Sequence, residues 1–142
     1  MNRQDVNREA QQMLGVVPGF LNAVPDEHVG SLWESMRLIQ LSPGKITAKN
    51  QQLIMLGVSV YAKCKYCTEF HTEVAKALGA TKEEITEVGL LVGHTAQWSG
   101  FLGAIQYDFE QFKREVKTAC NTLMSSKNGP QAGSQKQAPA RS

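Results

Sequence analysis

Cysteine, histidine and tryptophan are scarce in this chain of 142 residues, which contains three cysteines, three histidines and two tryptophans. So few cysteines do not make the disulfide framework of a small secreted domain. The first residues, MNRQDVNREAQQ, also lack the apolar stretch of a secretory signal. We therefore expect a cytoplasmic protein, in which a close pair of cysteines is typical of redox or metal chemistry.

A strong net charge is lacking as well, since the sequence has 15 basic and 13 acidic residues. Residues 125–142 hold three of the basic residues and no acidic residue, so the rest of the chain has 12 basic against 13 acidic residues. That balance gives no electrostatic footprint for nucleic acid. Residues 125–142 are rich in glycine, proline, serine and glutamine, which indicates a flexible tail. We expect one domain at residues 1–124 and a flexible C-terminal tail at 125–142.

The sequence has no stretch suited to a lipid bilayer. The longest uncharged run, VGLLVGHTAQWSGFLGAIQY at residues 88–107, is interrupted by His94, Thr95, Gln97 and four glycines. Lipid would solvate these residues poorly. We expect no membrane contact, and we interpret this run as helix buried in the protein or between subunits.

What the sequence does contain is helical periodicity along most of its length. Apolar residues recur at helical spacing, and no segment alternates cleanly as a strand would. The expected elements are six helices, at about residues 3–14, 27–41, 47–63, 66–79, 81–97 and 99–124. The predicted fold class is all-α.

Several residues mark where these helices begin and end. Asp26 is expected to cap the second helix, and Thr81 with Glu84 forms a capping-box pattern before the fifth. The first helix is expected to end at Gly15, and Gly79 resembles the glycine that follows a helix. Residues 53–62 carry no charge, so we expect the third helix to be enclosed on most sides, with Gly57 allowing another backbone to approach closely.

The segment KCKYCTEFH, residues 63–71, gathers two of the three cysteines and one histidine. If the chain is helical from Cys64 to His71, then Cys64, Cys67 and His71 fall within an arc of about 60°. Cys67 and His71 are four residues apart, so a thiol could pass its proton toward the imidazole. This matters because the thiolate, and not the thiol, is the reactive form.

Three interpretations of this cluster compete. Zinc would find three ligands and need a fourth, for which His28 and His94 are conceivable, but neither lies in a second ligand cluster. Alternatively the three residues could be purely structural. The presence of all three on one face favours redox chemistry, and a c-type haem is excluded because Thr68 occupies the histidine position of that motif. We expect no metal and no cofactor, and we interpret Cys120 as a small apolar residue of the last helix.

The segment QQLIMLGVSVYAKCKYCTEFH, residues 51–71, resembles the signature of the AhpD-like / carboxymuconolactone decarboxylase superfamily, in which C-x-x-C-x-x-x-H follows a helix that carries an acidic residue. The similarity continues through GVVPGFLNAV before it and ALGATKEEI after it, so it spans roughly residues 14–107. The resemblance implies an all-helical AhpD-like domain that works as a homo-oligomer, commonly a trimer or hexamer.

The dithiol-bearing members of this family cycle between dithiol and disulfide, and they reduce hydroperoxides or pass electrons to a peroxiredoxin. By resemblance, the candidate catalytic residues are Cys67 as the activated thiolate, Cys64 as its disulfide partner, and His71 with residue 52 as the proton relay. The expected partners are a hydroperoxide substrate and an external thiol or disulfide reductant.

The chain departs from the family pattern at residue 52, where a glutamate is expected and Gln52 is found. Glutamine can accept a hydrogen bond from His71 and fix its orientation, but it cannot take a proton or stabilise an imidazolium by charge. We therefore expect a peroxidase activity that is weaker or shifted to more alkaline pH than that of a glutamate-bearing relative.

Two alternative functions remain at the level of sequence. One is a decarboxylase or isomerase that acts on a small lactone or keto acid, with the cysteines incidental. The other is a non-catalytic redox sensor, for which Gln52 is the best support.

Overall fold

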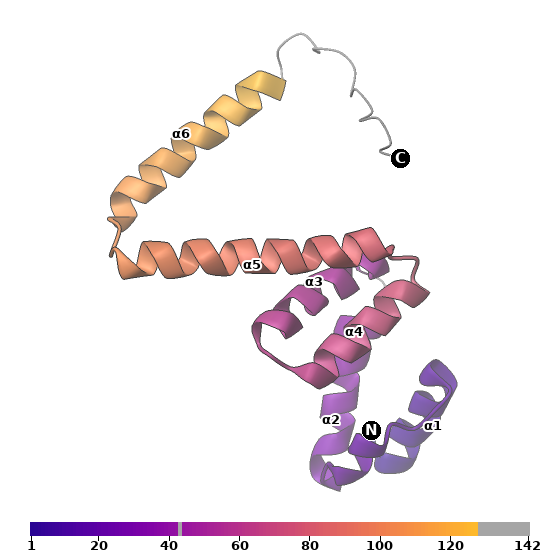
Figure 1. The fold of residues 1–142 in the computed structure, drawn as a ribbon. Coiled ribbons are helices and arrows are strands. Elements are labelled where there is room, and N and C mark those ends of the chain that lie inside the picture. Colours follow the sequence, from indigo (N-terminus) through magenta and orange to yellow (C-terminus); the bar gives the residue numbers. More distant parts are fainter. Residues whose placement is uncertain (43, 128–142) are drawn as a thin grey trace. The chain divides into compact units, whose positions relative to one another are not determined.

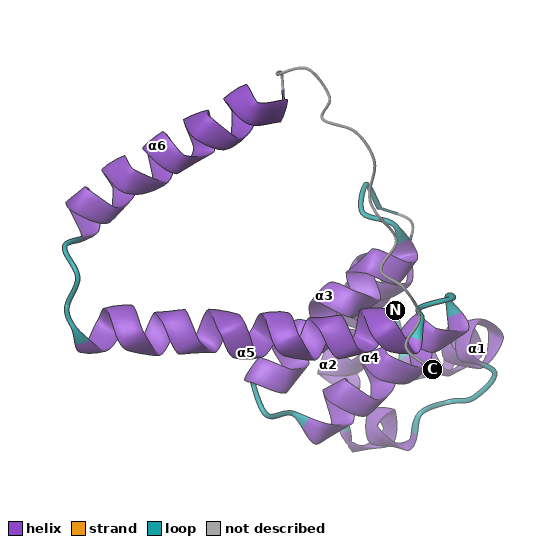
Figure 2. Ribbon diagram, turned by 45° about the horizontal axis from the view of Figure 1, so that its top comes forward, coloured by secondary structure: helices purple, strands orange, loops and turns teal. Residues whose placement is uncertain are grey.

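The computed structural model describes residues 1–42 and 44–127, and within these ranges the chain is helical with no strand (Figures 1 and 2). The elements are α1 (Arg3–Leu14), the 3-10 turn η1 (Gly19–Ala23), α2 (Asp26–Met36), the π-turn η2 (Arg37–Leu41), α3 (Ala48–Tyr61), α4 (Lys65–Ala77), α5 (Lys82–Ala104) and α6 (Phe109–Lys127). The all-α prediction with six helices is confirmed.

The chain divides into two units, Met1–Thr95 and Ala96–Ser142, with the division inside α5. The first unit holds α1 to α4 and the N-terminal part of α5. The second holds the end of α5 and α6. All the candidate site residues lie in the first unit.

One core cluster of the first unit is formed by five buried apolar side chains, Val6, Ala10, Leu21, Val29 and Trp33. Trp33 is fully buried, and its indole Nε1 donates a hydrogen bond of 2.9 Å to the Glu9 carboxylate. This bond supplies the polar partner that a buried indole N–H requires. The core therefore joins α1 to α2 and supports the segment that leads to α3.

Helices α3 and α4 lie side by side and are joined by a tight turn (Figure 1). Lys63 in this turn has a left-handed backbone with φ of 55°, and the Cys64 N–H donates to the Ser59 carbonyl at 3.0 Å. The face of α3 toward α4 is buried at Gln52, Leu56 and Ser59. The short connection thus brings the Gln52 side of α3 against the His71 side of α4.

The prediction that the third helix is enclosed on most sides is wrong within this chain. Ile54, Val58 and Tyr61 remain 55%, 65% and 65% exposed. The absence of charge indicated burial, but in the described part of the chain the only buried face of α3 is the one that carries Gln52, Leu56 and Ser59. The close approach of another backbone predicted at Gly57 is not found, because the atoms within 4 Å of a Cβ there would be those of the Val92 and Val88 side chains of α5, at 3.4 and 3.6 Å, which is an ordinary packing contact.

The predicted helix ends are mostly confirmed. Gly15 and Gly79 both have left-handed backbones, with φ of 72° and 86°, and each follows a helix. Thr81 and Glu84 form the reciprocal capping box, with N–H to oxygen distances of 2.9 and 3.1 Å. Asp26 is not an N-cap, because Pro25 holds that position and Asp26 is the first helical residue, paired with Arg3.

The boundary predicted between the fifth and sixth helices is wrong. Helix α5 runs without interruption to Ala104, and the break falls at residues 105–108, where Gln106 has φ of 50°. Asp108 accepts a hydrogen bond from the Gln111 N–H and so starts α6. Serine and glycine near residue 99 weaken a helix without ending it, whereas this aspartate provides a start signal that the sequence interpretation overlooked.

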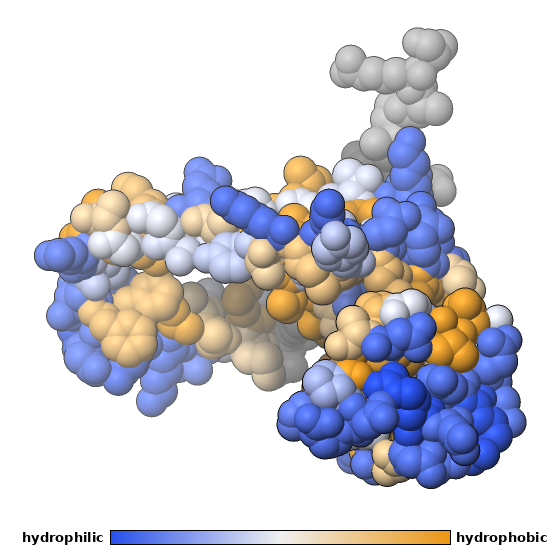
Figure 3. All heavy atoms as spheres, turned by 90° about the horizontal axis from the view of Figure 1, so that it is seen from below, coloured by the Kyte–Doolittle hydropathy of each residue, from blue (hydrophilic) through white to orange (hydrophobic). Residues whose placement is uncertain are grey.

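Helix α5 has no buried residue in the described structure. Hydrophobic residues, in orange, are visible at the molecular surface (Figure 3). The interpretation of residues 88–107 as a helix buried inside this chain is therefore wrong. No helix within residues 1–42 and 44–127 is long and apolar enough to cross a membrane. Residues 125–127 of the predicted tail belong to α6, and the remainder of that prediction lies outside the described residues.

Candidate functional site

The candidate site lies at the start of α4 and on the buried face of α3. Cys64 is the N-cap of α4, with an extended backbone, and its sulfur accepts a hydrogen bond from the Cys67 N–H at 3.3 Å. The assumption that the helix already includes Cys64 is therefore wrong. Cys64 instead uses its side chain to satisfy one of the free N–H groups at the start of the helix.

Cys64 and Cys67 are joined by a disulfide, with their Cα atoms 5.4 Å apart. Cys64 is half-buried and Cys67 is exposed, so Cys67 is the more exposed residue of the pair. The third cysteine, Cys120, lies on α6 and is exposed and free. The two cysteines that the sequence pattern pairs are thus the two that the structure joins.

His71 lies one turn after Cys67 on α4 and points into the protein, with only 7% of its surface exposed. The neighbouring Phe70 ring contacts it edge-on, with ring centroids 5.2 Å apart. Burial lowers the pKa of His71 below its usual value, because the imidazolium loses hydration there. A histidine in this environment is neutral over a wider pH range than an exposed one.

Gln52 is the partner of His71. The Gln52 side chain is 1% exposed, and its Oε1 lies 2.8 Å from His71 Nδ1. The Gln52 Nε2 donates in turn to the Gln40 main-chain carbonyl in η2, at 3.4 Å. The structure therefore brings Gln52 and His71 into direct contact, while the role of Gln40 was missed because a main-chain carbonyl leaves no mark in the sequence.

Glu69 and Glu73 do not take the place of the missing glutamate. Glu73 is exposed and pairs with Lys76 at 2.6 Å, and Glu69 is also exposed. Neither makes a hydrogen bond with His71. The only polar partner of the His71 ring among the described residues is the neutral amide of Gln52.

No group of three or more histidine, cysteine or carboxylate side chains that could hold a metal ion occurs among residues 1–42 and 44–127. His28 lies on α2 and His94 on α5, and both are exposed.

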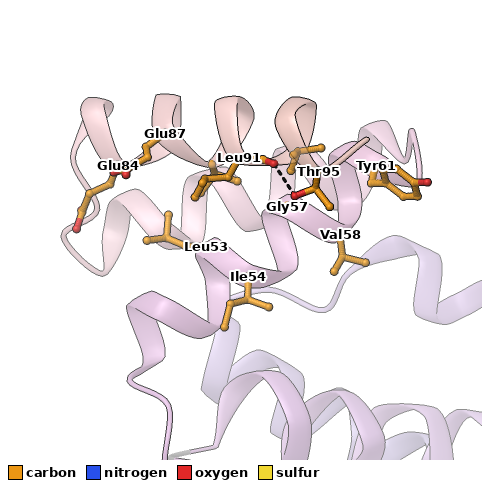
Figure 4. Close-up of a pocket in the computed structure, with 11 residues that line it drawn as sticks. Leu53, Ile54, Gly57, Val58, Tyr61, Glu84, Glu87, Leu91 and Thr95 are labelled. Atoms are coloured by element: carbon orange, nitrogen blue, oxygen red, sulfur yellow. Dashed lines mark hydrogen bonds between the residues drawn. The ribbon is translucent and has the colours of Figure 1, made fainter. Parts of the chain in front are cut away.

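A separate apolar groove of about 680 Å³ runs between α3 and the N-terminal part of α5 (Figure 4). Its α3 wall is formed by Leu53, Ile54, Gly57, Val58 and Tyr61. These residues centre about 170° around α3 from Gln52, which places the groove on the opposite face of this helix. None of the candidate site residues lines the groove, so it does not form part of the dithiol site.

The fold and this cluster define an all-helical protein with a cysteine pair at the start of one helix and a buried histidine one turn later. The sequence profile of the carboxymuconolactone decarboxylase family matches residues 27–107, and the chain belongs to this family. The matched region contains α2 from its second residue onward, α3 to α5, and the whole candidate site.

Two solved structures are similar to this chain. The alkylhydroperoxidase AhpD core from Rhodospirillum rubrum is 25% identical with a TM-score of 0.69, over 77% of this chain and 84% of that one. A protein from Methanobacterium thermoautotrophicum is 30% identical with a TM-score of 0.54, over 61% of this chain and 96% of that one. The search of curated proteins finds no match. The AhpD-like fold expected from the resemblance is confirmed.

Proposed function

We propose that this protein is a thiol-dependent oxidoreductase in antioxidant defence, which reduces hydroperoxides or passes electrons to a peroxiredoxin through Cys64 and Cys67. The observation that carries this proposal is the disulfide between an exposed Cys67 and a half-buried Cys64, one turn from a buried histidine. The similarity to a structure described as an alkylhydroperoxidase core supports the same chemistry.

In the reduced protein, His71 accepts the proton of the Cys67 thiol, directly or through a water molecule. The Cys67 thiolate attacks one oxygen of the hydroperoxide, the O–O bond breaks, and the leaving oxygen is protonated to give an alcohol or water. Cys67 is then a sulfenic acid. The Cys64 thiol attacks that sulfur, water leaves, and the disulfide forms; an external dithiol restores both thiols by exchange.

The neutral amide at position 52 limits this activity. Proton transfer from Cys67 creates a thiolate and an imidazolium, and Gln52 offers the imidazolium no compensating charge. Burial already disfavours the charged ring and lowers the pKa of His71. We therefore retain the expectation of a slow enzyme whose rate rises toward alkaline pH, where the thiol ionises without help.

The proposal includes a homo-oligomer, a trimer or hexamer by family resemblance. Support comes from large apolar side chains of the first unit that stay exposed on α3 and α5, such as Ile54, Val58, Leu90 and Leu91, at 55%, 65%, 70% and 58%. Surface of this kind commonly marks protein–protein contact. Light scattering on the purified chain tests this part, and a monomer at all concentrations would contradict it.

The redox proposal is tested by hydroperoxide turnover in the presence of a dithiol reductant. Cys67→Ser and Cys64→Ser are each expected to abolish multiple turnover, whereas Cys120→Ser, at an exposed free cysteine, is the matched control and is expected to retain it. Full turnover in the Cys64 and Cys67 variants would refute the proposal. In that case the decarboxylase or isomerase alternative would be favoured.

A further inference from the structure

The π-turn η2, at Arg37–Leu41, lies beside the candidate site and is not explained by the dithiol chemistry alone. Turns of this type are rare and occur frequently at functional sites, because they insert a residue and redirect a main-chain carbonyl. Here the carbonyl of Gln40 accepts a hydrogen bond of 3.4 Å from the Gln52 side chain. The turn thus presents a hydrogen-bond acceptor to the residue that contacts His71.

This contact determines which way the Gln52 amide faces. A carbonyl oxygen only accepts hydrogen bonds, so the end of the amide toward Gln40 must be the NH₂ group. The other end, the oxygen, then lies 2.8 Å from His71 Nδ1. Because that oxygen also only accepts, the hydrogen between them must belong to Nδ1.

We propose that the Gln40 carbonyl and the Gln52 amide act as a positioning pair that holds His71 as the Nδ1–H tautomer. Nε2 is then the ring nitrogen with a free lone pair. If the proposed function is correct, it is Nε2 that receives the thiol proton. An exposed histidine in water favours the opposite tautomer, with the hydrogen on Nε2, so the pair imposes a state that the free side chain does not prefer.

The same geometry gives a reason for an amide at position 52. Gln52 is 1% exposed, so both ends of its amide need partners, and both have them. A carboxylate could accept from Nδ1–H, but its second oxygen would face the Gln40 carbonyl with no hydrogen between the two acceptors. The Gln52 amide can donate to the Gln40 carbonyl, which a carboxylate could not do. The glutamine at position 52 therefore does more than remove the relay carboxylate.

The test is the ring tautomer of His71, measured by two-bond ¹H–¹⁵N correlation on the full-length oxidised protein at about pH 8, above the usual histidine pKa. The wild type is expected to show His71 protonated at Nδ1. Gln52→Met keeps a side chain of similar length but removes both hydrogen bonds, and it is expected to move His71 toward the Nε2–H tautomer. His71 protonated at Nε2 in the wild type, or unchanged in Gln52→Met, would overturn the proposal.

Two controls separate positioning from a general structural effect. Gln40→Ala leaves the main-chain carbonyl in place, so the His71 tautomer should not change. The ring signals of the exposed His28 should be the same in every variant. In addition, the Gln52 side-chain amide protons should exchange with solvent more slowly than those of the exposed Gln97, and equal rates would refute the link to Gln40.

This test does not depend on turnover. If the tautomer is as expected but Cys67→Ser keeps full activity, the positioning pair stands and the proposed redox function fails. If Cys67→Ser is inactive but His71 carries its hydrogen on Nε2, the redox function stands and the positioning pair fails.

Discussion

Replacing Gln52 by glutamate is expected to raise the pKa of His71, the reverse of what burial does in the wild type. The Gln52 oxygen lies 2.8 Å from Nδ1, so the substitution places a negative charge directly beside the ring. Opposite charges in contact favour the ionised forms of both groups. The lowered pKa of the wild-type ring has burial as its cause, with no charged partner to offset it.

The size of this effect follows from the geometry. Two unit charges about 4 Å apart at an effective dielectric constant of about 20 attract each other by about 4 kcal/mol. The cost of a carboxylate at a position that is 1% exposed, facing the Gln40 carbonyl, offsets part of this attraction. We expect a net rise of about one to two pKa units, which is roughly 1.4 to 2.7 kcal/mol.

The consequence is a more favourable proton transfer from Cys67 to His71. Each pKa unit gained by the imidazole makes the thiolate–imidazolium pair about tenfold more populated relative to the neutral pair. Gln52→Glu should therefore raise the rate of peroxide reduction near neutral pH and move the pH profile toward acid. The assays are an NMR titration of the His71 ring and peroxide turnover between about pH 6 and 9, the range in which imidazole and thiol titrate.

Gln51→Glu is the matched control, since it adds the same charge one residue away on another face of α3 and has no contact with His71. It should leave the His71 pKa and the pH profile nearly unchanged. If Gln52→Glu neither raises the rate nor moves the pH profile, the charge at position 52 does not drive proton transfer from Cys67 to His71. A His71 pKa that falls further in this variant would contradict the electrostatic reasoning directly.

Three further predictions concern stability. The pKa of His71 is lowered in the folded protein, so the unfolded chain binds more protons than the folded chain at pH values between the folded pKa and about 6.5. The free energy of unfolding should therefore fall as the pH drops through this window. His71→Gln should make this fall smaller, as measured by urea denaturation at several pH values. Trp33→Ala should cost about 3 to 5 kcal/mol by urea denaturation, because Trp33 is fully buried and bonded to Glu9, and a loss below 1 kcal/mol would contradict its place in the core. Thr81→Ala should cost about 1 kcal/mol through loss of the capping box, whereas Thr86→Ala, an exposed position on the same helix, should cost clearly less.

Local sequence signals were sufficient for much of the fold. The end of α1 at Gly15 and the capping box at Thr81 depend on interactions within a few residues, so the sequence predicts them directly. The pairing of Cys64 with Cys67 is local in the same sense. The condition that the helix includes Cys64, on which the arc of about 60° was based, is not met, because Cys64 is the N-cap that precedes α4.

Errors arose where tertiary contacts or main-chain geometry decide the outcome. The exposed side of α3 could not be recognised from its uncharged sequence, since burial depends on what packs against that face. Gln52 and His71 are 19 positions apart, so no local sequence pattern indicates that they meet. The family resemblance predicted their contact. The Gln40 carbonyl could not be anticipated, because any residue at that position would supply one.

The central claim is that Cys64 and Cys67 form a redox pair that a hydroperoxide oxidises, and thiol titration tests it most directly. The fully reduced protein, with three cysteines, is treated with one equivalent of hydroperoxide per chain, and its free thiols are counted before and after. The account predicts a loss of two thiols, with Cys120 remaining, and their recovery with repeated turnover when a dithiol reductant is supplied. Thiols that stay unreactive, or a loss confined to Cys120, would contradict it.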